Sequence, residues 1–110
     1  MIASQIRDRY LRDPLQIRLG GLAADLARVA SFSKNLKNRN AVAGLLEESK
    51  YFAEWTADDA SLEIQELLVE LQMIVVRWER QWITGHMASD MQEQAQQWAD
   101  RLLELSGLAC

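Results

Sequence analysis

The chain contains one cysteine, one histidine and one proline in 110 residues, which excludes much of the chemistry that proteins perform. A single cysteine cannot form an internal disulfide, and one cysteine with one histidine cannot complete a structural zinc site. Nucleophilic catalysis assisted by an imidazole would depend entirely on His86, which follows Gly85 in a predicted connection between helices. We therefore expect a non-enzymatic protein with no catalytic residue, no metal and no cofactor, and we interpret His86 as a loop residue.

Long apolar runs are also missing. The most apolar stretch, residues 67–76, is ten residues long and contains Glu70 and Gln72, whereas a helix across a bilayer needs about twenty apolar residues. Charged residues occupy the N-terminal positions where a signal peptide has its apolar segment. These features predict a cytoplasmic protein without a membrane partner. The other proportions, 49% hydrophobic and 25% charged residues, predict a single domain covering residues 1–110.

The net charge of −4 hides an asymmetry along the chain. Residues 1–39 carry eight basic and three acidic residues, and residues 40–110 carry four basic and thirteen acidic residues. The basic part could dock an anionic partner, or it could lie against the acidic part of the same or a second chain. A sequence pI near 4.9 argues against nucleic acid as the partner. The candidate contacts to an anionic partner are Arg7, Arg9, Arg12 and Arg18.

The pattern of apolar residues predicts helices throughout, with a short helix over residues 3–12 followed by four longer ones. Asp13 is the predicted N-cap of the first long helix, with Pro14 at its first position. Residues 33–38 form a predicted connection, after which helices follow at about 39–55, 57–84 and 90–106. Thr56 is the predicted N-cap of the third long helix, and Gly85 its left-handed C-terminal residue. We expect an all-α, four-helix, up-down type bundle.

Two glycines, Gly20 and Gly21, lie inside the apolar stripe of the first long helix. Glycine within a helix costs up to about 1 kcal/mol relative to alanine, so the pair requires an explanation. A kink is one interpretation. The stripe continues without a change of phase, which favours close approach of another backbone.

The predicted third long helix is too apolar and too long for a surface helix. Its middle is apolar nearly all round, whereas a surface helix needs a stripe of about 100°. One of its rows consists of Leu62, Val69, Met73, Val76 and Ile83. Its 28 residues would span roughly 42 Å, against a radius of gyration of about 13 Å for a compact domain of this size. Both features favour a homodimer. The candidate interface consists of Leu68, Val69, Met73, Val76, Trp82 and Ile83.

A second interpretation is a small-ligand or metal-binding bundle. Glu63, Glu66 and Glu70 share one helical face, where carboxylates can bind a divalent cation, although a solvated face is the simpler explanation. Because Glu70 falls in the most apolar stretch, we expect it to pair with an Arg or Lys. The other candidate ligand site is a predicted tryptophan cluster, although a role as core or interface residues is the favoured explanation. It would contain Trp55, Trp78, Trp82 and Trp98.

Three segments resemble a family of small, all-helical, uncharacterised proteins of cyanobacteria. They are LARVASFS at residues 26–33, LLEESKYFAEWTADDA at 45–60 and EIQELLVELQ at 63–72. The likeness covers about the middle half of the chain and does not extend to residues 88–110. It implies a bacterial cytoplasmic setting and provides no functional residue. Taken together, the sequence predicts a self-associating helical protein that acts through protein–protein contacts, and it leaves open whether residues 88–110 pack on their own subunit.

Overall fold

The structure, a computed structural model, describes residues 4–85 and 89–108, and all regular secondary structure in these residues is helical. Its elements are α1 (Ser4–Arg12), α2 (Leu15–Phe32), the 3₁₀ helix η1 (Leu36–Asn38), α3 (Arg39–Ala57), α4 (Leu62–Thr84) and α5 (Ser89–Ser106). The predicted all-α fold and the short N-terminal helix are therefore confirmed.

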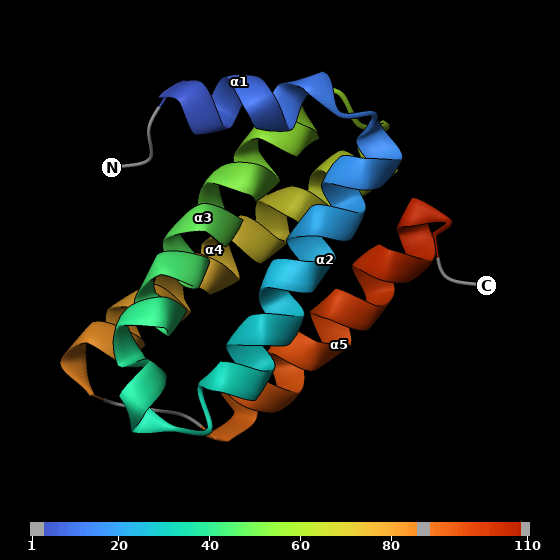
Figure 1. Cartoon of the computed structure of the whole chain (residues 1–110). Coiled ribbons are helices and arrows are strands. Elements are labelled where there is room, and N and C mark those ends of the chain that lie inside the picture. Colours follow the sequence, from blue (N-terminus) through green and yellow to red (C-terminus); the bar gives the residue numbers. More distant parts are fainter. Residues whose placement is uncertain (1–3, 86–88, 109–110) are drawn as a thin grey trace.

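Helices α2 to α5 run along one another, and successive helices reverse direction (Figure 1). Helix α2 packs against both α5 and α3, and α3 packs against α4. Helix α1 crosses the end of this group and contacts α3 (Figure 1). The contact between α2 and α5 answers one open question, because the described part of the C-terminal segment packs on its own subunit.

Two predicted helix starts are wrong. The N-cap of α2 is Pro14, not Asp13, and Pro14 makes no side-chain cap bond; its carbonyl accepts the first helical hydrogen bond from the Arg18 amide. Helix α3 continues through Thr56 to Ala57. The N-cap of α4 is instead Ser61, whose hydroxyl accepts a hydrogen bond from the Ile64 amide at 3.4 Å.

The later start shortens α4 and removes one argument for a dimer. Its 23 residues span roughly 34 Å, which fits within the longest dimension of the molecule, 35 Å. The predicted 28-residue helix is therefore wrong, and α4 is not too long for its domain. The predicted end is confirmed, because Gly85 adopts a left-handed conformation with φ of 78°.

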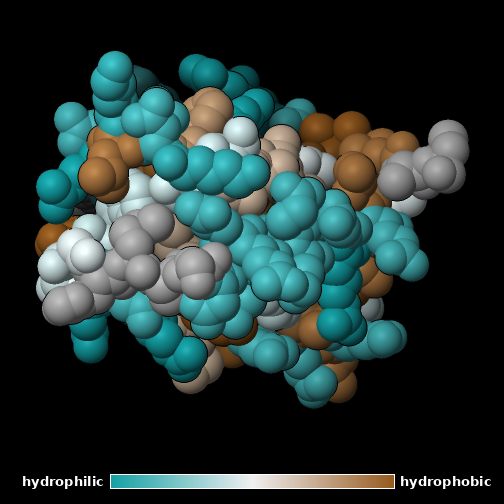
Figure 2. Space-filling view, turned by 90° about the horizontal axis from the view of Figure 1, so that it is seen from below, coloured by the Kyte–Doolittle hydropathy of each residue, from teal (hydrophilic) through white to brown (hydrophobic). Residues whose placement is uncertain are grey.

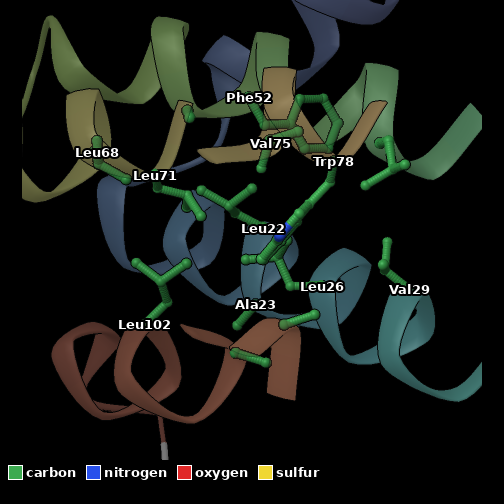
Figure 3. Close-up of a cluster of buried hydrophobic side chains, with 14 of the residues drawn as sticks. Leu22, Ala23, Leu26, Val29, Phe52, Leu68, Leu71, Val75, Trp78 and Leu102 are labelled. Carbon is green, nitrogen blue, oxygen red and sulfur yellow. The ribbon is translucent and has the colours of Figure 1, made fainter. Parts of the chain in front are cut away.

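The main core lies between α2, α3, α4 and α5 (Figure 3). Each fully buried leucine stabilises the fold, because removing apolar surface from water contributes about 25 cal/mol of free energy per Å². Helix α4 contributes its inner row of side chains, which we define as Leu68, Leu71, Val75, Trp78 and Trp82. These pack with Leu22, Leu26 and Val29 of α2 and with Leu102 of α5 (Figure 3).

The two glycines of α2 differ in their surroundings. A Cβ at Gly20 would lie 2.7 Å from Cδ1 of Leu108, whereas a Cβ at Gly21 would meet nothing within 4 Å. The predicted close approach thus occurs at Gly20 alone, and the group that approaches is a side chain and not a backbone.

A second group of aromatic residues anchors α1. The rings of Tyr10 and Phe52 stack with centroids 3.9 Å apart, and Trp55 packs beside them. The Tyr10 hydroxyl donates to the Arg18 carbonyl at 3.0 Å and lies 2.6 Å from Oγ1 of Thr56. Burial raises the pKa of Tyr10 well above its usual range, so the phenol remains a neutral partner in these bonds.

Candidate interaction surface

Helix α4 carries a row of exposed apolar side chains on its outer face. The side chains on it are exposed, with Leu62 at 71%, Met73 at 66% and Ile83 at 67%, whereas Leu68, Leu71 and Val75 are at 0%. Large hydrophobic side chains exposed in a contiguous group mark interaction sites, whereas scattered ones are ordinary. We call this group the outer seam, and it consists of Leu62, Val69, Met73, Val76 and Ile83.

The spacing of the outer seam is that of a coiled-coil face. Leu62, Val69, Val76 and Ile83 recur every seventh residue, and Met73 lies between the two valines at spacings of four and three. Side chains at this spacing form a narrow stripe that meets another helix at about 20°. A hollow of about 310 Å³, lined by Met73, Val76 and Gln72, opens at the middle of the stripe. The seam therefore has the pattern that packs against one further helix.

The exposed charged side chains near the outer seam change from acidic to basic along α4. Glu66 and Glu70 lie in the N-terminal half of α4, Arg77 and Arg80 lie in the C-terminal half, and all four are exposed. None of them takes part in the ion pairs found among residues 4–85 and 89–108. The Glu79 carboxylate, in contrast, accepts a hydrogen bond from Lys50 of α3 at 3.0 Å. One end of the outer face is thus acidic and the other basic.

Four of the six candidate interface residues belong to the outer seam: Val69, Met73, Val76 and Ile83. The other two, Leu68 and Trp82, are buried in the subunit's own core, and Trp82 Nε1 donates to the Arg39 carbonyl at 2.9 Å. Leu62 was not among the candidates, although its place in the same seventh-residue row is a sequence signal that identifies it.

The candidate arginines are divided between the interior and the surface. Arg18 is buried, and its guanidinium donates to Asp59 at 2.9 Å and to the Asp13 carbonyl at 3.1 Å. Part of the basic segment thus meets the acidic region of its own chain, and Arg18 has no free face for a partner. Arg7, Arg9 and Arg12 are exposed on α1, with the Arg7 guanidinium 6.0 Å from the centre of the Trp55 ring.

The structure provides little for the metal or ligand interpretation. Glu63, Glu66 and Glu70 are all exposed, and in the described part of the chain no three acidic, histidine or cysteine side chains form a group that could hold a metal ion. Since Glu70 is exposed, the desolvation that required a basic partner is absent, and no ion pair within the described ranges includes it.

The four tryptophans are spread over the fold. Trp55 contacts Tyr10, Tyr51 and Phe52, Trp78 and Trp82 belong to the inner row of α4, and Trp98 lies half-buried on α5. Trp55, Trp78 and Trp82 are therefore core residues, and Trp98 packs against the core. The candidate loop residue His86 and the terminal Cys110 lie outside the described residues.

The end of the molecule that carries the α2–α3 connection is mostly hydrophilic (Figure 2). Hydrophobic residues appear mainly at the edges of this view. An open hollow of about 630 Å³ is formed by the C-terminal part of α2 with α5, and most of its side chains are polar. It lacks the apolar enclosure typical of small-ligand pockets. The lining residues are Ala30, Ser31, Lys34, Gln92, Glu93, Gln96 and Gln97.

A buried carboxyl group on α2, beside the partly exposed Glu48 of α3, was missed in the sequence. Asp25 is 3% exposed, and its Oδ2 has no hydrogen-bond partner among the described residues, while Oδ1 accepts from Arg28 at 3.1 Å. Burial and the neighbouring Glu48 carboxyl raise the pKa of Asp25 to about 8, against the opposing effect of Arg28. The sequence feature that indicates burial of Asp25 is its position three residues after Leu22 and four before Val29, on the core side of α2.

Within the described residues, none of the helices is both long and apolar enough to cross a membrane. Comparisons with protein-family models, with curated proteins and with solved structures found no match to this chain. The fold and its exposed surfaces are therefore the basis for a functional assignment.

Proposed function

We propose that this is a non-enzymatic protein that self-associates through the outer seam of α4 and acts through protein–protein contacts. The supporting observation is the continuous exposed seam on a subunit whose core is otherwise complete. Helix α4 already buries five side chains of its inner row, so the subunit does not need a second apolar row for its own packing. Such a row becomes favourable only when another surface removes it from water.

The proposal also covers the architecture and the setting. The alternating directions of α2 to α5 in Figure 1 support a four-helix up-down bundle with α1 as an additional helix. A cytoplasmic location and membership of a cyanobacterial family are predictions from the sequence, and a pull-down from such a cell with wild-type protein as bait would identify further partners.

Sedimentation equilibrium between 1 and 100 µM tests self-association. We expect the wild type to form dimers with a Kd in the micromolar range, which is typical of a small interface. Replacing Met73 by Glu places a charge at the centre of the seam, and we expect at least a tenfold weaker dimer. Since Met73 is 66% exposed, the variant should unfold at the same urea concentration as the wild type when both are monomeric.

Ile17→Glu is the matched control, because Ile17 is also an exposed apolar residue, at 44%, but lies on α2. We expect its dimer to be as tight as that of the wild type. A wild type that stays monomeric at 100 µM, or equal weakening by both substitutions, would overturn the proposed function.

A further inference from the structure

The order of charges along α4 specifies how two copies meet, and the following inference rests on the proposed function. We infer that the outer seam pairs with the same seam of a second copy in antiparallel orientation, with a two-fold axis close to Met73. The partner is thus a second copy of this chain, and each subunit supplies the same surface to the interface, as closed two-fold dimers do.

Charge complementarity determines the relative orientation of the two α4 helices. Glu66 lies seven residues before Met73 and Arg80 lies seven residues after it. An antiparallel pair with its axis at Met73 therefore brings Glu66 of each copy level with Arg80 of the partner subunit. Glu70 and Arg77, three residues before and four after, become opposed in the same way. All four side chains are exposed in the subunit, so they are available for these contacts.

A parallel pair would create the opposite electrostatic pattern. It would set Glu66 against Glu66 and Arg80 against Arg80, and like charges at such positions are unfavourable. The two orientations bury the same apolar side chains, so the charges decide between them.

The apolar positions fit the same axis. Val69 and Val76 lie four residues before and three after Met73, and Leu62 and Ile83 lie eleven before and ten after it. Antiparallel pairing therefore places each of these residues near its counterpart on the partner subunit. The hollow lined by Gln72, Met73 and Val76 lies at the axis, where the partner's Met73 can pack into it as a knob packs into a hole.

A second copy explains this surface more completely than another partner. An unrelated helix would need its own apolar stripe with basic residues at one end and acidic residues at the other. The outer face of α4 already possesses that complement in reverse order. A membrane surface would not favour exposed Glu66 and Glu70 on the face that it covers.

Charge-exchange variants test the pairing by sedimentation equilibrium at low ionic strength. Glu66→Arg alone, or Arg80→Glu alone, opposes like charges at two symmetric places in an antiparallel dimer. We expect each to weaken dimerisation about tenfold, because two attractive pairs of opposite charge become repulsive. The double variant Glu66→Arg/Arg80→Glu restores opposite charges across the axis, and its Kd should return to within about threefold of the wild type.

These variants separate the inference from the proposed function. If Met73→Glu disrupts the dimer but the double variant is no tighter than either single one, the antiparallel pairing is wrong while self-association through the seam stands. If the wild type does not dimerise at all, the proposed function fails and the inference fails with it.

A distance measurement checks the orientation independently. The variant Glu63→Cys/Cys110→Ser carries one thiol, at the flank of the seam, for a spin label. Because Glu63 lies ten residues before Met73, antiparallel pairing separates the two labelled backbone positions by roughly 30 Å along the helices at 1.5 Å per residue. Parallel pairing separates them by little more than the 8–10 Å between packed helices. A distance near the shorter value would overturn the inference.

Discussion

The inner row and the outer seam of α4 are both rows of apolar side chains, but their surroundings are opposite. Leu68, Leu71 and Val75 are fully buried in the core shared with α2, α3 and α5, while Leu62, Met73 and Ile83 are about two-thirds exposed or more. One row of this kind is enough to fix a helix on its own domain. The difference teaches that folding of the subunit explains only the inner row of α4, and the outer seam is the part for which we propose a role in association.

The largest expected effect is the loss of an inner side chain. Leu71 is fully buried, so Leu71→Ala removes packed methyl groups and leaves a cavity. We expect the free energy of unfolding to fall by about 2–5 kcal/mol, measured by urea denaturation at a concentration where the protein is monomeric. A loss below about 1 kcal/mol would show that the inner row is not what holds α4 in place.

A smaller effect should come from the buried carboxyl of α2. Because the pKa of Asp25 is raised from 3.8 to about 8 in the folded chain, the native state binds a proton that the unfolded state has released. The contribution of this proton to the free energy of unfolding is fully present below about pH 4 and is lost as the pH rises towards 8. For Asp25→Asn, which keeps a neutral side chain, we expect a flatter profile and a melting temperature a few degrees above that of the wild type at pH 8.

Thermal melts of both proteins between pH 5 and pH 8.5 provide the measurement. Exposed Asp100 of α5 offers a matched control, because Asp100→Asn changes the same group outside the core and should leave the pH dependence as it is in the wild type. Parallel profiles for the wild type and Asp25→Asn would contradict the assigned role of this carboxyl.

The smallest effect on folding should come from the outer seam. Val76 is 39% exposed, so Val76→Ala should change the stability of the monomer by no more than about 0.5 kcal/mol. The same substitution should weaken the dimer severalfold, because the methyl groups that it removes lie beside Met73 at the proposed axis. A less stable monomer with an unchanged dimer Kd would contradict the distinction between the inner row and the outer seam.

The local pattern was sufficient to predict one short helix followed by four longer ones and to identify the outer row of α4. The seventh-residue spacing of Leu62, Val69, Val76 and Ile83 is visible without any knowledge of the fold, and so is the left-handed end at Gly85. These features depend on neighbours along one helix, and neighbours along a helix are fixed by the order of residues.

Contacts between distant segments could not be predicted in this way. Thr56 is followed by Ala-Asp-Asp, a convincing start for a helix, yet it lies inside α3, where its hydroxyl bonds to Tyr10, 46 residues away. Arg18 resembled a surface arginine until the fold placed Asp59 beside it. A tertiary bond thus replaced the helix cap expected of Thr56 and the partner contact expected of Arg18, because buried polar groups require partners.

The central claim, that the outer face of α4 contacts its own counterpart, is tested most directly by isotope-filtered NMR. A mixture of methionine-methyl-labelled and unlabelled protein reports contacts between different molecules only. We predict intermolecular contacts from the Met73 methyl group to valine methyl groups of the partner subunit. The buried Met91 methyl, 2% exposed in its own subunit, should give none. Absence of any such contact from Met73 at millimolar concentration would contradict the account.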